Sequence, residues 1–262
     1  MSHHDALSLD KQGYIDSPVH RLDPRAKVIV TLVYIVTVVS YPKYSISPMF
    51  PFILYPMALA ILGFMRLKSI LKQIALAMPF LVLIGLFNPI LDRRPLLEIN
   101  GFVINGGWVS FASILLRGLL CISAVTVLIG TTSFPRIAEA LGALGVPRVL
   151  VVQLMFLYRY LFLLVAESQR MNSAKALRSG ASKTSLSTAA SMLSVLLTRT
   201  MDRGDSIWMA MKARGFSGEM KTAQRAKWRS SDTIFVVIVI VACILLRIFP
   251  ITQIIGDLGR TL

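Results

Sequence analysis

The sequence has little negative charge, few histidines and few cysteines. Its 262 residues include 13 Asp and Glu against 28 Lys and Arg, with 3 His and 2 Cys. Charged residues make up 16% of the chain, whereas a soluble domain has about 25%. The hydrophobic share of 55% excludes an intrinsically disordered chain, because disorder requires low hydrophobicity. A formal net charge of +15 on such an apolar chain is typical of a multi-span membrane protein with its basic residues gathered on one side of the bilayer.

The motifs of catalytic and metal sites are missing from the sequence. It has no H-E-x-x-H and no C-x-x-C, so we predict neither a catalytic residue nor a metal ligand. Cys121 and Cys243 lie in apolar stretches and are interpreted as small buried hydrophobes. Residues 180–184 resemble a phosphate-binding loop but lack the Gly before Lys183. Any ATP that drives this protein must therefore be bound by another chain.

Five apolar stretches predict transmembrane helices, which need about 20 residues each. They are Val28–Tyr41, Tyr44–Met65, Gln73–Leu91, Trp108–Thr131 and Ile234–Ile255. The first is the shortest, and Lys27 can extend it by reaching toward the membrane surface. None contains an acidic residue, which argues against a carrier built on intramembrane carboxylates. We expect Arg117, in the fourth stretch, to face the bundle interior and to bind backbone carbonyls or a companion subunit.

The basic residues also assign a side of the membrane to each region. Leu150–Val165 is apolar enough to be ambiguous, but the segment Thr132–Ser231 holds 15 of the 28 basic residues. If 150–165 crossed the bilayer, most of that charge would face outward, against the positive-inside rule. We therefore predict an all-α integral membrane protein with about five transmembrane helices. Its predicted regions are a cytoplasmic N-terminal segment (1–27), a four-helix transmembrane region (28–131), a cytoplasmic helical domain (132–231), and a fifth transmembrane helix with a tail (232–262).

The predicted cytoplasmic domain has clear helix boundaries. A short helix opens near Pro135 and ends at Gly142 or Gly145, and a second runs from Pro147 to about residue 180. A third runs from about Ser185 to Lys212. Its apolar stripe, interpreted as packing within the domain, is Leu193, Leu197, Met201, Trp208 and Met211. The second helix is more apolar than a water-exposed helix, so we expect it to lie against the membrane region or a partner.

The most specific local feature is the end of the third helix, Met211–Phe216. Gly215 can adopt the left-handed conformation that terminates a helix. Arg214 would then project from the tip with a planar set of donors, and Ala213 is small enough to let a partner approach.

Three regions together resemble the transmembrane T component of energy-coupling factor (ECF) importers, in its CbiQ-like, cobalt and nickel branch. They are the opening Ser17–Lys27, the segment Tyr158–Glu167, and the tip Ala213-Arg214-Gly215. The family has a similar Arg and Gly tip on the preceding helix. It matches Arg178 and Gly180 here, although Ser179 separates them.

The resemblance implies a scaffold rather than an enzyme. Such a chain joins two cytoplasmic ABC ATPase subunits, which bind ATP and Mg²⁺, to a membrane S component (CbiM-like) that binds substrate. A small accessory membrane subunit is also compatible with this branch. The resemblance assigns ATPase coupling to Arg178, Gly180, Ala213, Arg214 and Gly215. It gives the chain no bound cofactor, cobalt as its first substrate, and nickel or a vitamin such as biotin as alternatives. The expected location is the bacterial cytoplasmic membrane, with the N-terminus inside.

Three other classes fit the residues less well. A self-contained carrier should show repeated halves or broken polar helices, and the sequence shows no internal repeat. A membrane enzyme should show acidic or His clusters at the membrane surface. A nucleic-acid binder would need aromatic stacking platforms among the basic residues of 170–229, so we expect no nucleic acid as a partner.

Overall fold

The computed structural model describes residues 17, 19–91, 95–99, 102–179, 185–216 and 228–248. The chain divides into two compact units. The larger unit comprises residues 1–140 and 226–262, and the α7–α8 unit comprises residues 141–225. The prediction of four regions with boundaries at 27, 131 and 231 stays a prediction.

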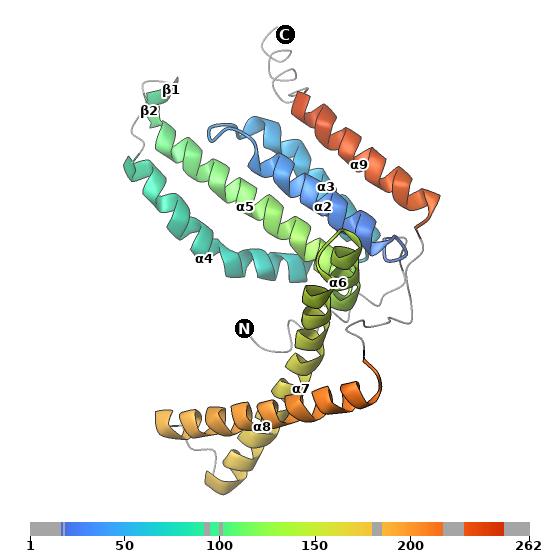
Figure 1. The fold of residues 1–262 in the computed structure, drawn as a ribbon. Coiled ribbons are helices and arrows are strands. Elements are labelled where there is room, and N and C mark those ends of the chain that lie inside the picture. Colours follow the sequence, from blue (N-terminus) through green and yellow to red (C-terminus); the bar gives the residue numbers. More distant parts are fainter. Residues whose placement is uncertain are drawn as a thin grey trace. The chain divides into compact units, whose positions relative to one another are not determined.

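The larger unit contains helices α2 (Pro24–Val39), α3 (Leu54–Leu62), α4 (Leu67–Leu91), α5 (Gly106–Thr131) and α9 (Ser230–Ile248) (Figure 1). It also contains most of α6 (Phe134–Ala143), because the boundary between the units follows Ala140. Helix α2 packs against both α5 and α9. Tyr34 lies in the core, fully buried, and its hydroxyl donates to the carbonyl of Phe52 at 2.9 Å. The Tyr34 ring also stacks on Tyr55, with 4.5 Å between the ring centroids. The core therefore draws on segments from both ends of the chain, because Cys243 of α9 joins it.

Helices α4 and α5 pack closely against each other, and small residues allow it. A methyl group on Gly85 would lie 2.7 Å from the Phe111 ring, and one on Gly118 would lie 2.5 Å from Leu81. Replacing either glycine would therefore force the neighbouring side chain to move.

The predicted single helix over Tyr44–Met65 is wrong. The structure has a 3₁₀ helix, η1 (Ser47–Ile53), which leads into α3, and Phe64 has a φ of 51° just beyond it. Pro48, Pro51 and Pro56 lie in this segment. Because proline has no backbone N–H, it removes bonds that an α-helix needs, and the chain forms 3₁₀ geometry around Pro51 instead.

A short β-hairpin links α4 to α5, which we did not predict. Strand β1 (Pro95–Ile99) pairs antiparallel with β2 (Phe102–Asn105), and Leu97 lies opposite Ile104. The all-α class is nevertheless correct, because every other regular element among the described residues is helical.

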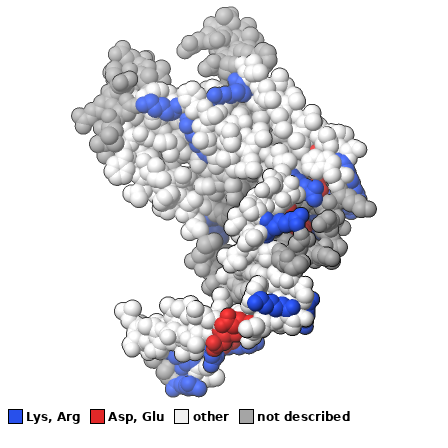
Figure 2. All heavy atoms as spheres, viewed as in Figure 1, with Lys and Arg blue, Asp and Glu red and all other residues white. Residues whose placement is uncertain are grey.

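Four of the described helices are long and apolar enough to cross a membrane. They cover Leu67–Pro89, Gly106–Thr131, Arg148–Arg178 and Ser230–Ile248, whereas Ser47–Leu62 is a shorter apolar segment. Helices α4 and α9 expose large apolar side chains such as Phe80 and Ile238, and Figure 2 shows a mostly uncharged surface over the larger unit. Such surface is suited to contact with lipid. The chain is an integral membrane protein with several membrane-crossing helices.

Two span predictions need separate treatment. Residues 249–255 of the predicted last span lie outside the described residues. Helix α7 has the length and apolarity of a span, so the placement of Leu150–Val165 outside the bilayer rests on the distribution of basic charge and stays a prediction.

The α7–α8 unit consists mainly of two long helices, α7 (Arg148–Ser179) and α8 (Leu186–Ala213). Their predicted boundaries are confirmed. Gly145 precedes α7 with a φ of 103°, and the Ser185 side chain accepts a hydrogen bond from the Thr188 N–H at the start of α8. At its other end Gly215 has a φ of 73°, and the Phe216 N–H donates to the carbonyl of Met211 at 3.0 Å. This is the glycine-terminated helix end that the sequence predicts.

Candidate functional site

The two arginines singled out by the sequence lie at the ends of the two long helices. Arg178 is in the last turn of α7, and Arg214 is the residue at which α8 ends. Both are exposed, as is Ala213. A guanidinium at an exposed helix end can bind carboxylates or carbonyls of a partner with several donors at once. Gly180, the other predicted residue at the α7 end, lies outside the described residues.

Gly215 holds Arg214 in place through the backbone. The space around Gly215 is open, since a methyl group there would meet nothing within 4 Å. Its φ of 73° is nevertheless in the left-handed region that residues with a Cβ rarely adopt. The glycine is therefore needed for the conformation of the helix end and not for room.

An ion pair joins α7 to α8. The guanidinium of Arg199 donates to the Glu167 carboxylate at 2.6 Å, and Arg170 lies 3.8 Å from the other oxygen of Glu167. Figure 1 shows the two helices crossing. Glu167 lies in one of the segments that carry the family resemblance, but the sequence gave no sign that it pairs with Arg199, because 32 positions separate the two residues.

Two hollows lie along this helix pair. One, of about 270 Å³, adjoins the ion pair and is lined by Tyr160, Leu163, Leu164, Ala166, Glu167, Arg170, Arg199, Thr200, Arg203, Gly204 and Ile207. The other, of about 610 Å³, extends toward Arg214 and Phe216. Arg203 borders both. The two helices are therefore loosely packed, with a charged contact where they meet and open space beside it.

The apolar stripe of α8 is exposed. Leu197 is 56% exposed and Met201 72%, and α8 has no buried residue. The interpretation of this stripe as packing within the domain is wrong. The periodicity correctly identified an apolar face, but the described residues do not bury it. An apolar face that the described residues leave exposed is typical of a surface that contacts another molecule.

Arg117 binds backbone oxygen within the larger unit. It donates to the carbonyl of Pro42 at 2.6 Å and to the Ser113 hydroxyl at 3.1 Å. Arg247 of α9 acts in a similar way, since it donates to the carbonyl of Ser40 at 3.2 Å and lies over the Tyr41 ring. Two arginines thus hold the turn that follows α2, and backbone carbonyls serve as acceptors in place of carboxylates.

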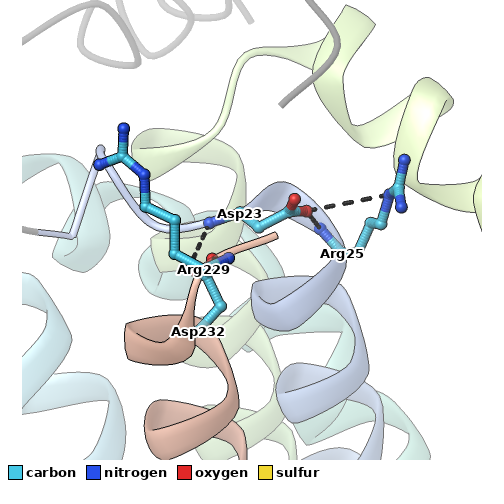
Figure 3. A network of polar contacts seen from close by, with 4 residues as sticks. All are labelled: Asp23, Arg25, Arg229 and Asp232. Atoms are coloured by element: carbon cyan, nitrogen blue, oxygen red, sulfur yellow. Dashed lines mark hydrogen bonds and ion pairs between the residues drawn. The ribbon is translucent and has the colours of Figure 1, made fainter. Parts of the chain in front are cut away.

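A buried polar cluster lies at the opposite end of α2. Lys27 donates to the carbonyl of Thr131 at 2.9 Å. The Asp232 carboxylate accepts from the backbone N–H of Asp23 at 2.9 Å and from that of Arg229 at 2.8 Å. Figure 3 shows the contacts of Asp232 with Asp23 and Arg229 at the first turns of α2 and α9. We call Asp23, Lys27 and Asp232 the junction cluster. The sequence marked the opening Ser17–Lys27, but nothing in it pointed to Asp232.

The protonation of Lys27 depends on its burial. Lys27 precedes the first residue of the predicted span. Burial lowers the pKa of Lys27 to about 7, as does the nearby charge of Arg136, while Asp23 and Asp232 act in the opposite direction.

The part of the chain that the structure describes contains no group of three or more His, Cys, Asp or Glu side chains that could hold a metal ion. Its chemistry, as far as the described residues show it, is that of ion pairs, helix ends and apolar faces.

Comparison with known proteins agrees with this architecture. A family model described as "Cobalt transport protein" (CbiQ) matches residues 16–224. The energy-coupling factor transporter transmembrane protein EcfT of Streptococcus thermophilus is 26% identical over 256 residues, which cover 90% of this chain and 96% of that protein. EcfT of Limosilactobacillus fermentum is 26% identical over 88% of this chain and 92% of its own length. Protein MJ1571 of Methanocaldococcus jannaschii is 28% identical over 51% of this chain and 47% of its own length.

The fold defines the class of the protein, which is an all-α membrane protein with a pair of long, incompletely packed helices. The chain belongs to the CbiQ family, as the match over most of its length shows. It is a transmembrane T component of the ECF transporter type, so the resemblance seen in the sequence is confirmed.

Proposed function

We propose that this chain is the non-catalytic scaffold of an ATP-driven importer. It joins two cytoplasmic ATPases to a membrane S component and carries their movement between them. The observation that supports this most directly is the α7–α8 unit, which presents two exposed arginine-bearing helix ends and an uncovered apolar face. Two helix ends of similar chemistry suit two similar partners, one for each.

In this proposal Arg178 and Arg214 each bind one ATPase subunit. Their guanidinium donors bind carboxylates or helix-end carbonyls on the ATPase surface. Ala213 supports the α8 contact by leaving room, and Gly215 supports it by fixing the helix end. The family resemblance assigns Gly180 to the corresponding contact that follows α7. ATP and Mg²⁺ bind to the ATPases, and this chain holds no cofactor.

The S component contacts the apolar surface of the helix pair. Such a surface allows a membrane partner to tilt or slide, because apolar contacts are not directional. A CbiM-like S component and a small accessory membrane subunit are the partners that the family branch favours. We propose cobalt as the substrate, ahead of nickel and of a vitamin such as biotin, because the family model carries cobalt transport in its description.

The orientation follows from the charge. The N-terminus and the basic segment 132–231 face the cytoplasm of a bacterial cell, since basic loops stay on that side.

The test uses charge reversal at both helix ends. Arg178→Glu and Arg214→Glu, alone and together, are expressed with the ATPases and the S component, and the complex is purified through a tag on this chain. Losing one anchoring arginine at an interface costs about 2 kcal/mol or more of binding free energy. The amount of ATPase that co-purifies with each single variant should therefore fall about tenfold or more. The control Lys68→Glu reverses an exposed positive charge outside the α7–α8 unit and should assemble normally. Normal assembly and uptake in the double variant would overturn the assignment of these arginines.

A second experiment decides the substrate. Vesicles with the complete wild-type complex are supplied with ATP and with radioactive cobalt(II), nickel(II) or biotin in separate assays. Accumulation of cobalt above the other two supports the cobalt assignment, and accumulation of nickel or biotin alone replaces it.

A further inference from the structure

The α7–α8 unit is joined to the larger unit by two stretches of chain, at residues 140/141 and 225/226. The first stretch contains α6, which begins shortly after α5 ends. The second ends at Arg229, directly before α9. Any force that the chain itself carries between the two units must pass through these two connections.

The first connection starts from a carbonyl held by Lys27. Thr131 is the last residue of α5, and its carbonyl accepts from the Lys27 ammonium at 2.9 Å. Both residues are buried, Lys27 at 3% exposure. Because the last carbonyls of a helix have no partner within the helix, this bond fixes the point at which the chain leaves α5.

The second connection ends at an N–H held by Asp232. The Arg229 N–H donates to Oδ2 of Asp232 at 2.8 Å, which is the acidic half of a capping box at the start of α9. The other oxygen, Oδ1, accepts from the Asp23 N–H at 2.9 Å. One carboxylate therefore ties the start of α9 to the start of α2, although 209 positions separate Asp23 from Asp232.

The remaining members of the cluster link these two bonds. Asp23 caps α2 by accepting from the Arg25 N–H at 2.8 Å, and Lys27 is one turn further along the same helix. The first turn of α2 thus bonds to Thr131, where the first connection starts, and to Asp232, just after the second connection ends. Figure 3 shows the Asp232 side of this arrangement. Asp232 is only 2% exposed, and charged groups this buried are retained at a cost that apolar packing would avoid. Oδ2 of Asp23 has no hydrogen-bond partner among the described residues, so the cluster is not optimised for stability alone.

We propose that Lys27 and Asp232 are positioning residues that clamp the two connections to the first turn of α2. Movement of the α7–α8 unit is then passed to the transmembrane helices. Without the clamp, fraying of the ends of α5 and α9 would absorb that movement. This inference rests on the proposed coupling function. It gives the opening segment Ser17–Lys27 a mechanical role distinct from the ATPase contacts at Arg178 and Arg214.

The test separates coupling from assembly. Lys27→Met keeps an unbranched side chain only one atom shorter but removes its donor, and Asp232→Asn removes the charge. Each is introduced into the complete complex in lipid vesicles. ATPase retention and ATP hydrolysis should stay near wild type, whereas substrate accumulated per ATP hydrolysed should fall about fivefold. The substrate supplied is cobalt(II), or nickel(II) or biotin if the wild-type complex accumulates one of those instead. Lys68→Met, which removes an exposed lysine at the start of α4, is the matched control.

A second readout does not depend on the substrate. Amide hydrogen exchange reports local opening, and each variant should speed exchange at both ends of the clamp, around Thr131–Arg136 and Arg229–Thr233. Acceleration about tenfold at the far connection, for example near Thr132 in Asp232→Asn, is expected only if one cluster holds both. If Asp232→Asn does not reach the membrane, Lys27→Met decides the outcome by the same two readouts.

The outcomes distinguish the two proposals. If the wild-type chain holds no ATPase, the proposed function fails. If the wild-type complex transports and both variants match it in substrate per ATP and in exchange, the clamp is wrong while the proposed function stands.

Discussion

The larger unit and the α7–α8 unit are stabilised in different ways. The larger unit buries aromatic and small side chains from helices at both ends of the chain, and it satisfies its helix ends with buried polar groups. In the α7–α8 unit, α8 has no buried residue, and ion pairs of Glu167 and two hollows lie along the described part of the helix pair. The larger unit is therefore stabilised mainly by its own contacts. The exposed apolar face of the α7–α8 unit fits the proposal that other chains pack against it.

The largest effect should come from matched core and surface truncations. Tyr34→Ala removes a fully buried ring and should destabilise the larger unit by about 3–5 kcal/mol, by analogy with buried aromatic truncations. Leu197→Ala on α8 should change the stability of the isolated chain by less than about 0.5 kcal/mol but weaken the complete complex. Thermal unfolding in detergent measures the first quantity and co-purification the second. Strong destabilisation of the isolated chain by Leu197→Ala would contradict the conclusion that the apolar face of α8 contributes little to the stability of the chain alone.

The junction cluster should give the larger unit a distinctive pH dependence. The pKa of Lys27 is lowered to about 7 by burial and by Arg136, with Asp23 and Asp232 opposing, whereas the unfolded chain has the ordinary lysine value. Between about pH 7 and pH 10 the unfolded state therefore binds more protons, and stability rises with pH. The wild type should gain about 2 kcal/mol over Lys27→Met between pH 7 and pH 9. A stability difference that is constant or shrinks as the pH rises would contradict the buried position of Lys27.

The Glu167–Arg199 pair should contribute a modest amount to the helix crossing. Its side chains are 28% and 61% exposed, so water screens the pair, and we expect a coupling energy of about 0.5–1 kcal/mol. A double-mutant cycle with Glu167→Gln and Arg199→Gln measures it. The charge-swapped variant with Glu167→Arg and Arg199→Glu should recover part of the loss in complex assembly. Identical assembly of the swapped and single variants would show that the Glu167–Arg199 pair does not contribute to it.

Two glycines of the α7–α8 unit should respond in opposite directions. Gly204 lies within α8 and has open space around it, so Gly204→Ala should stabilise the helix by about 0.5–1 kcal/mol. Gly215 has a φ of 73°, so Gly215→Ala should destabilise the helix end by about 1 kcal/mol. Amide exchange in the last turn of α8 distinguishes them. Protection of that turn by Gly215→Ala would show that its left-handed conformation is not required.

The sequence predicted the structural features that depend on neighbouring residues, but not the contacts between segments far apart in the chain. Ser185 and Gly215 set the ends of α8 through contacts within a few residues, so their residue types were sufficient. The prolines of Tyr44–Met65, Pro48, Pro51 and Pro56, also indicate a break in that segment, whereas the length of its apolar run alone predicts an unbroken span. The bond between Asp23 and Asp232 joins segments 209 positions apart, and no periodicity carries that information.

The candidate site shows the same limit. The sequence located Arg178 and Arg214 because helix ends have recognisable residues. It identified the apolar stripe of α8 but not what covers it, because a periodic pattern reports an apolar face and says nothing about the molecule that packs on it.

We propose that this chain works only as part of an ATP-driven complex. The most direct measurement is to purify it through a tag from native membranes, identify the bound chains, and assay uptake by the purified material in vesicles. We expect two ATPase subunits and a small, very hydrophobic S component to co-purify, and uptake to require ATP. A chain that purifies alone and transports substrate without an ATPase would contradict it.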